Sequence, residues 1–362
     1  MAADQSIQPA RSGAEHPELD MLEAIHEKNQ SMAWQSRADA LQGLSKTVSK
    51  QRNEILSDDL RRKIRTAIMK ERSGDVRGPG DRFRSLIAAE QVGVDFSALK
   101  KIQDAAHRQV ATTFAGASNR FRYSETVVGS SPDWFASPPP IIWTPLPDPN
   151  REKVFRPPFM GSWDRFIQNQ ATGDGRVIAN DSYLDGTSRL GSKIVARNHD
   201  ASDVDIISVR RETGYLVRFK TLRTGILQVK ADLQSLYCHH SVVTEDEFGW
   251  SDFNASTRSR LVLAVFWNWE DVDPANETSD QWFVAGISCS GDGESYPGDT
   301  TQVQPGQRRI VNLYTTMAIE ENVKVWIYVG LADEIWAFLN DVSIDIAIDS
   351  SWLLNSLSVR SI

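Results

Sequence analysis

The side chains best suited to ligand chemistry in this sequence are tryptophans that stand beside acids. Trp250 lies in EFGWSDF and Trp336 in ADEIWAF. An exposed Trp offers a flat apolar face next to a polar edge, an arrangement that stacks on sugar rings. We therefore predict that Trp250 and Trp336 lie in exposed loops and bind a ligand. The alternative is that the tryptophans of this half of the chain fill the core, which is their usual role.

Calcium is the metal that the acidic turns would suit. Asp200, Asp203 and Asp205 fall in HDASDVD, and Ca²⁺ takes six to eight oxygen ligands of this kind. Asp203 and Asp205 point to the same side of an extended chain, so these three acids are the first choice for a Ca²⁺ site. Asp also forms local hydrogen bonds in turns, so an ordinary turn remains the alternative. We expect no other cofactor.

The sequence carries no motif of a known catalytic site. It lacks the phosphate-binding loop, the dinucleotide-binding glycine pattern, HExxH, GxSxG and CxxC. Cys238, His239 and His240 form the densest group of metal-ligand types, but adjacent strand residues point to opposite faces, so at most two could share a metal. A glycosidase would need two carboxylates about 5–10 Å apart, and spacing identifies no such pair. The sequence therefore predicts a non-enzymatic protein.

Composition narrows the class of protein further. The chain has 362 residues and a formal net charge of -8, and this acidic balance argues against nucleic acid as a partner. No apolar run reaches the roughly 18–20 residues of a membrane-spanning helix. The first residues lack an apolar signal-peptide core. We therefore expect synthesis in the cytoplasm, with incorporation into a particle or a non-classical export route as possible destinations.

The elements that must position these residues differ between the two halves. Residues 1–17 are polar and aperiodic and indicate a flexible leader. In residues 18–115, apolar side chains such as Leu22, Ile25 and Leu44 recur at helical spacing. This pattern predicts a helical hairpin or a coiled-coil-like region. Its apolar stripe is narrow and needs a partner, either within the hairpin or from another chain.

A proline-rich strap separates the two halves. Residues 129–166 hold nine of the 15 prolines, interleaved with aromatic side chains, and such a segment favours an extended conformation. We assign residues 116–166 to this linker strap. Its aromatic side chains should be buried, either on the chain's own β-domain or on a neighbouring molecule.

Residues 167–362 alternate apolar and polar side chains with the period of β-strands. The run of residues 342–349, VSIDIAID, is the cleanest example. Eight to ten strands separated by turns predict an antiparallel β-sandwich, jelly-roll-like in form. The predicted fold class is thus α+β and multidomain, with a helical region, a Pro-rich strap and a C-terminal sandwich.

These expectations lead to two hypotheses of function. The first is a structural or binding protein that self-associates or binds protein partners through residues 18–115 and strap 129–166, with the sandwich used for recognition. A component of a larger particle, such as a virion, a phage tail or a contractile apparatus, would suit it. The second is a carbohydrate-binding or carbohydrate-active β-sandwich with a glycan partner and with calcium as a stabilising ion. No motif assigns the chain to a family.

Overall fold

The structure is a computed structural model, and it describes one long helix and a β-sandwich. Isolated helical residues are also described between 59 and 109. Among all the residues that the structure describes, no helix is long and apolar enough to span a membrane. The described ranges are 18–55, 152–159, 161–171, 175–198, 204–246, 252–271, 273–292, 298–340 and 342–362.

The helix is α1 (Glu18–Ile55). The strands are β1 (Glu152–Phe155), β2 (Gly161–Ala171), β3 (Arg176–Ser182), β4 (Arg189–Asn198), β5 (Val204–Lys220), β6 (Leu227–Asp246), β7 (Asp252–Trp267), β8 (Glu277–Asp292), β9 (Asp299–Val303), β10 (Arg308–Tyr314), β11 (Lys324–Asn340) and β12 (Val342–Ser361). Two short 3₁₀ helices, η2 (Trp269–Asp271) and η3 (Pro274–Asn276), connect β7 to β8.

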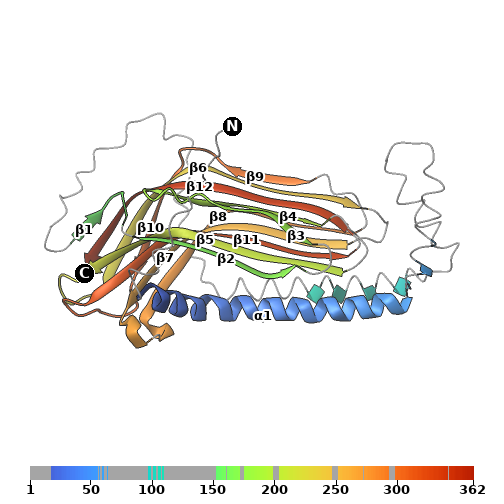
Figure 1. The fold of residues 1–362 in the computed structure, drawn as a ribbon, viewed down its shortest axis with the longest axis horizontal. Helices are drawn as coiled ribbons and strands as arrows, with labels where there is room; N and C mark the ends of the chain where they lie inside the picture. The colour runs from blue at the N-terminus through green and yellow to red at the C-terminus, as the bar shows by residue number, and fades with distance from the viewer. Residues whose placement is uncertain are drawn as a thin grey trace, which may run out of the picture.

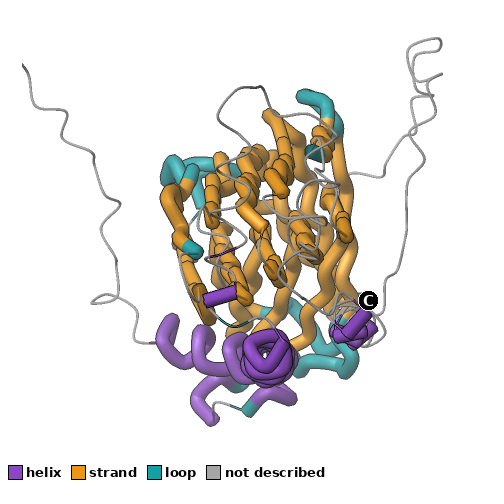
Figure 2. Tube along the Cα trace, turned by 90° about the vertical axis from the view of Figure 1, so that its right-hand side faces the viewer, coloured by secondary structure: helices purple, strands orange, loops and turns teal. Residues whose placement is uncertain are grey.

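The strands form two antiparallel sheets that pack face to face (Figure 2). Sheet A has seven strands in the order β10-β6-β12-β4-β3, with β1 also paired to β12 and β9 to β6. Sheet B has five strands in the order β2-β5-β11-β7-β8. The predicted antiparallel β-sandwich is therefore confirmed. β1 and the first part of β2 fall within residues 116–166, and both pair with strands of the sandwich.

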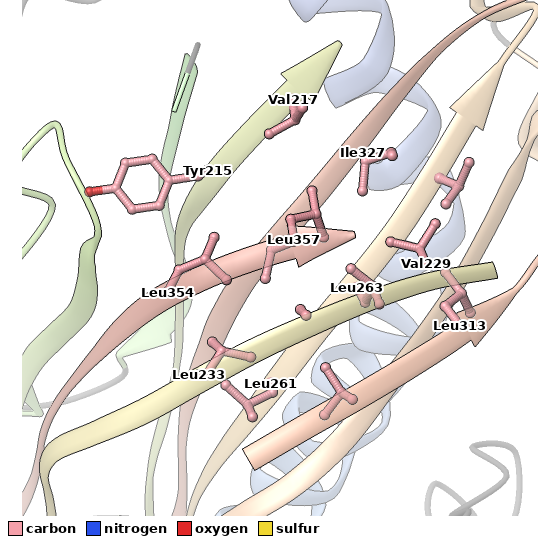
Figure 3. Packing of buried hydrophobic residues seen from close by; sticks show 14 of the residues in the cluster. Tyr215, Val217, Val229, Leu233, Leu261, Leu263, Leu313, Ile327, Leu354 and Leu357 are labelled. Atoms are coloured by element: carbon pink, nitrogen blue, oxygen red, sulfur yellow. The ribbon is translucent and has the colours of Figure 1, made fainter. Parts of the chain in front are cut away.

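On β12 the interior of the sandwich follows from the alternation of apolar and polar residues along the strand. On β12 the side chains of Val342, Ile344, Ile346 and Ile348 are buried, while the residues between them are half-buried. Leucines and valines of the two sheets interdigitate in the same way further along the sandwich (Figure 3). Burying one such side chain contributes about 1.5–3 kcal/mol, so this core holds the two sheets together.

Helix α1 lies along the outer face of sheet B, so that helix, sheet B and sheet A form three layers (Figure 1). Leu22 packs near Trp326, and Leu44 packs near Trp336. Leu22 and Leu44 are 22 residues apart on the helix, or about 33 Å. Trp326 and Trp336 are ten residues apart on β11, also about 33 Å. The helix therefore runs parallel to the strand beneath it.

This packing shows what the narrow apolar stripe of the helix contacts. Leu22, Ile25, Leu44 and Val48 are buried against sheet B of the same chain. Ala106, one of the isolated helical residues, joins the cluster of Leu44 and Val48. The helix predicted from residue 18 is confirmed, and its stripe is used within the chain. Self-association through the helices stays a prediction. The leader 1–17 and residues 116–151 of the strap lie outside the described residues.

Candidate functional site

One of the two predicted ligand-binding tryptophans is not exposed. Trp336 lies on β11 with 2% of its surface exposed, under α1 and beside Phe338. The prediction of an exposed loop at this position is therefore wrong. The neighbouring acids suggested solvent, but Asp333 and Glu334 are themselves buried and have hydrogen-bonding or ionic partners. Trp250 lies outside the described residues.

The predicted calcium site is only partly described. Asp205 is buried at the start of β5, and the Asn198 side chain on β4 donates a 2.7 Å hydrogen bond to it. Asp200 and Asp203 lie outside the described residues. In the parts of the chain that the structure does describe, no group of three His, Cys, Asp or Glu side chains could hold a metal ion. In the structure, Asp205 thus acts as a buried hydrogen-bond acceptor.

A polar cluster around His240 lies inside the sandwich. The His240 Nδ1 atom is 2.8 Å from the Thr257 hydroxyl, and Nε2 is 2.9 Å from the Ser259 hydroxyl. Ser259 donates to Asp333. The oxygen of Ser259 is then free to accept from Nε2–H, and Nδ1 accepts from Thr257. This order of donors requires a neutral His240, in agreement with its pKa, which burial lowers to about 4.

The cluster has the residue types of a hydrolase triad but not the geometry. Ser259 stands between His240 and Asp333, so the imidazole is not oriented by the carboxylate. Asp333 also accepts from Ser192 and Ser350, and burial raises its pKa to about 6. All of these side chains are buried between the sheets. The cluster therefore satisfies buried polar groups, and we assign it no reaction.

A second buried network joins α1 to sheet B. The His26 Nδ1 atom is 2.8 Å from Glu277, and Nε2 is 3.3 Å from Glu212. Burial alone would lower the pKa of His26, but the two carboxylates outweigh it and raise the pKa to about 9. Asn29, one helical turn on, donates to Glu277 as well. His26 is thus a buried cation that binds α1 to the acidic side chains of sheet B.

Sheet B supplies the counter-charges of this network. Arg210 pairs with Glu212 and, at 3.0 Å, with Glu334. Arg260 contacts Glu334 at 3.1 Å. The Tyr328 ring packs beside this network, with its centroid 5.9 Å from that of the His26 ring. Every charge named here has a partner of opposite sign. The network therefore holds α1 on sheet B, and we do not assign it a ligand.

The open face of sheet A, which points away from sheet B, presents a different surface. No described helix packs on it (Figure 1). A row of polar side chains crosses it, each directly opposite the next in the strand register. The row is Asp181, Lys193, Asp349, His239 and Gln302. Its four intervals between strands span about 19 Å. The row therefore offers alternating hydrogen-bond donors and acceptors across five strands.

Two tyrosines and an arginine stand beside this row. The Tyr183 and Tyr237 rings meet edge to face, with centroids 6.2 Å apart. The Arg189 guanidinium lies 4.7 Å over the Tyr183 ring and donates to the Tyr237 hydroxyl and, at 2.8 Å, to Ser351. The Tyr183 hydroxyl donates to Asp349 at 3.0 Å. Burial, followed by contact with Tyr237 and Asp349, raises the pKa of Tyr183, so the phenol stays a hydrogen-bond donor.

The Asp185 side chain stabilises the turn that carries Tyr183 and Arg189. The Asp185 carboxylate accepts from the backbone amides of Thr187 and Arg189 and from the Tyr215 hydroxyl. Burial would raise the pKa of Asp185, but these backbone hydrogen bonds lower it to about 2. The carboxylate therefore stays ionised and holds the turn, which preorganises the two side chains for a ligand.

A β-bulge helps to place Tyr237. Ser351 pairs with Tyr237 and Trp352 pairs with Ser235, so Leu236 is an extra residue on β6. A bulge redirects the side chains next to it, and here it lies beside the Tyr183 turn. Sequence reasoning missed this site. The turn signal Asp185-Gly186, two residues after a tyrosine, was the one local clue.

Comparison with known proteins assigns no family. No family model and no curated protein matches the chain. The chain has weak structural similarity to two carbohydrate-binding modules and a phage tailspike domain. TmCBM61 in complex with β-1,4-galactotriose matches with a TM-score of 0.15 and 10% identity, over 50% of this chain and 86% of that one.

The two other similarities are equally weak. The family 11 carbohydrate-binding module of cellulase Lic26A-Cel5E from Clostridium thermocellum gives a TM-score of 0.16 and 12% identity, over 56% of this chain and 94% of that one. The enzymatically active domain of tailspike protein 4 from bacteriophage CBA120 gives a TM-score of 0.14 and 7% identity, over 54% of this chain and 18% of that one. At these scores, what those proteins bind or do says nothing about this chain.

Proposed function

We propose that this protein is a non-catalytic glycan-binding module, and that its ligand lies on the open face of sheet A. The observation that carries the proposal is the preorganised group of Tyr183, Tyr237 and Arg189 beside the polar row. On the described part of sheet B, α1 covers aromatic residues such as Trp326 and Trp336, while Phe283 on β8 stays exposed and serves below as the control.

The chemistry of this group suits a sugar. A pyranose has apolar C–H faces, which pack against an aromatic ring, and a rim of hydroxyls, which need both donors and acceptors. The two tyrosine rings are half-buried and supply the apolar contact. Asp349 accepts, while Arg189 and Lys193 donate. Asp181, Lys193 and Asp349 alternate in sign across neighbouring strands, so the row favours an uncharged ligand over a polyanion.

The experiment is a binding screen against neutral oligosaccharides and polysaccharides with matched variants. We expect Tyr183→Ala and Tyr237→Ala each to weaken binding several-fold, since an aromatic contact contributes about 0.5–1.5 kcal/mol beyond its buried area and about 1.4 kcal/mol is tenfold in affinity. Phe283→Ala is the control, because this aromatic side chain on β8 of sheet B is also exposed, by 49%. Equal binding by the wild type and both tyrosine variants would refute the proposal.

A structural role in a larger particle is the second candidate. It is favoured by a group of apolar side chains exposed at one end of the sandwich, namely Leu222, Ile226, Met317 and Ile362. Backbone hydrogen bonds join Ile226 to Ile362, and Thr315 links β6 to the Met317 turn. Such a patch suits a protein contact. Light scattering on the wild type and on Ile226→Ser with Met317→Ser would detect self-association through it, and identical monomer masses would exclude it.

A further inference from the structure

A second polar and aromatic group lies on the open face of sheet A, near the other end of β6. The Tyr314 side chain on β10 is 51% exposed, and the Gln228 side chain donates a 2.8 Å hydrogen bond to its hydroxyl. Gln228 is directly opposite Tyr314 in the register, and Arg360 and Glu152 continue the same row on β12 and β1. This group therefore spans four strands.

The strand pleat places this group on the same face as the first. On β10 the side chains of Val311 and Leu313 are in the sandwich core, so Asn312 and Tyr314 point outward. On β6 the core residues Val229 and Ala231 alternate with outward-pointing residues in the same way. From Tyr237 to Gln228 is nine residues, or about 30 Å along the strand.

On β6, the outward side chains between the two groups are polar, while Ile310 on the neighbouring β10 is an exposed apolar side chain. Lys230, Asp232 and Gln234 occupy the outward positions of β6 along this path, as the register with β12 shows. Arg308 on β10 binds the Asp232 carboxylate with two hydrogen bonds, of 2.7 and 2.5 Å. Asp232 is thus neutralised by Arg308, and Glu152 lies opposite Arg360 in the second group. A track of hydrogen-bonding groups joins the two groups, and its charged residues are three basic (Lys230, Arg308 and Arg360) and two acidic (Asp232 and Glu152), so the net charge along it is small.

We propose that Tyr314 and its neighbours form a second contact site for the same ligand, and that this ligand is an uncharged, unbranched polysaccharide that lies lengthwise along β6. This inference rests on the proposed function and specifies the class of its ligand. Two contact sites on one face bind a polymer with a high effective concentration at the second site. The protein should therefore prefer long chains to short ones.

The test is a titration by calorimetry with a length series of the neutral oligosaccharide that the binding screen selects. For the wild type, affinity is expected to rise at least tenfold once the chain spans about 30 Å, as expected for two linked contacts. Tyr314→Ala is expected to remove this gain, and Asn312→Ala to reduce it. Phe283→Ala is the control and should keep the whole length dependence.

Each outcome separates the two proposals. If Tyr237→Ala weakens binding but affinity does not depend on chain length, or Tyr314→Ala keeps the gain, the second contact site is refuted and the glycan-binding function stands. If no neutral glycan of any length binds, or Tyr237→Ala has no effect, the proposed function fails and the second site fails with it. Thermal unfolding of each variant confirms that lost binding does not reflect lost folding.

Discussion

Removal of the His26 side chain is the perturbation whose effect the structure defines best. The imidazole lies between Glu277 and Glu212, and all three groups are buried. His26→Gln keeps a polar side chain at this position but removes the positive charge. The two carboxylates then stay buried with their remaining partners, Asn29 and Ser279 for Glu277 and Arg210 for Glu212.

The expected loss of stability follows from two independent arguments. Removing one partner of a buried ion pair costs about 3–5 kcal/mol. The pKa of His26 rises from 6.5 to about 9 on folding, and at 1.36 kcal/mol per pKa unit this corresponds to about 3 kcal/mol. Because the folded chain holds this proton more tightly, the contribution is complete below pH 6.5 and is lost as the pH rises through about 9.

The assay is urea unfolding of the wild type and His26→Gln at pH 6.5 and at pH 9.5. The free energy of unfolding should fall by about 3 kcal/mol in the variant at pH 6.5, and the two proteins should converge at pH 9.5. Lys50→Ala, at an exposed position of α1, is the control and should change stability by less than about 0.5 kcal/mol. A variant with wild-type stability at pH 6.5, or a difference that does not shrink with pH, would show that His26 is not the buried cation described here.

Three further predictions concern the core of the sandwich and the helix-facing side of sheet B. Burial raises the pKa of Asp333 to about 6. The stability that the protonated carboxyl contributes is therefore present below about pH 4 and is lost as the pH rises through 6. Asp333→Asn should flatten the pH dependence of the unfolding free energy in this range, and an unchanged slope would contradict this. A β-carbon at Gly330 would lie 2.0 Å from the Tyr328 hydroxyl and 2.7 Å from a backbone oxygen. Gly330→Ala should therefore displace the Tyr328 ring and lower the melting temperature. A variant with the wild-type melting temperature would refute this close contact. Trp336→Ala should cost about 3–5 kcal/mol in unfolding free energy as a large-to-small core substitution, whereas a loss below about 1 kcal/mol in urea unfolding would mean that Trp336 is exposed after all.

The features that could be predicted from the sequence are those set by local periodicity. The alternation of residues 342–349 predicts a strand with one buried face, and β12 has that strand and that burial. The spacing of Leu22, Ile25 and Leu44 predicts a helix from residue 18, and α1 begins there. Both patterns depend only on neighbours within a few turns or residues of one element.

The candidate site could not be predicted, because it depends on the register between distant strands. Tyr183, Tyr237 and Ser351 come together only when β12 pairs with both β4 and β6. Trp336 is a position at which the local sequence predicts exposure but the tertiary structure buries the side chain. Its acidic neighbours indicate solvent, but sheet B is covered by α1 on one face and by sheet A on the other, so Asp333 is buried against serines and Glu334 against arginines. The jelly-roll-like strand arrangement stays a prediction.

The most direct test of the central claim is a crystal structure of the chain with the neutral oligosaccharide that binds best. We predict that the sugar lies on the open face of sheet A, with a ring against Tyr183 or Tyr237 and hydroxyls bonded to Arg189 and Asp349. A sugar bound anywhere else, such as beside Phe283 on sheet B, with the tyrosine group empty, would contradict the account.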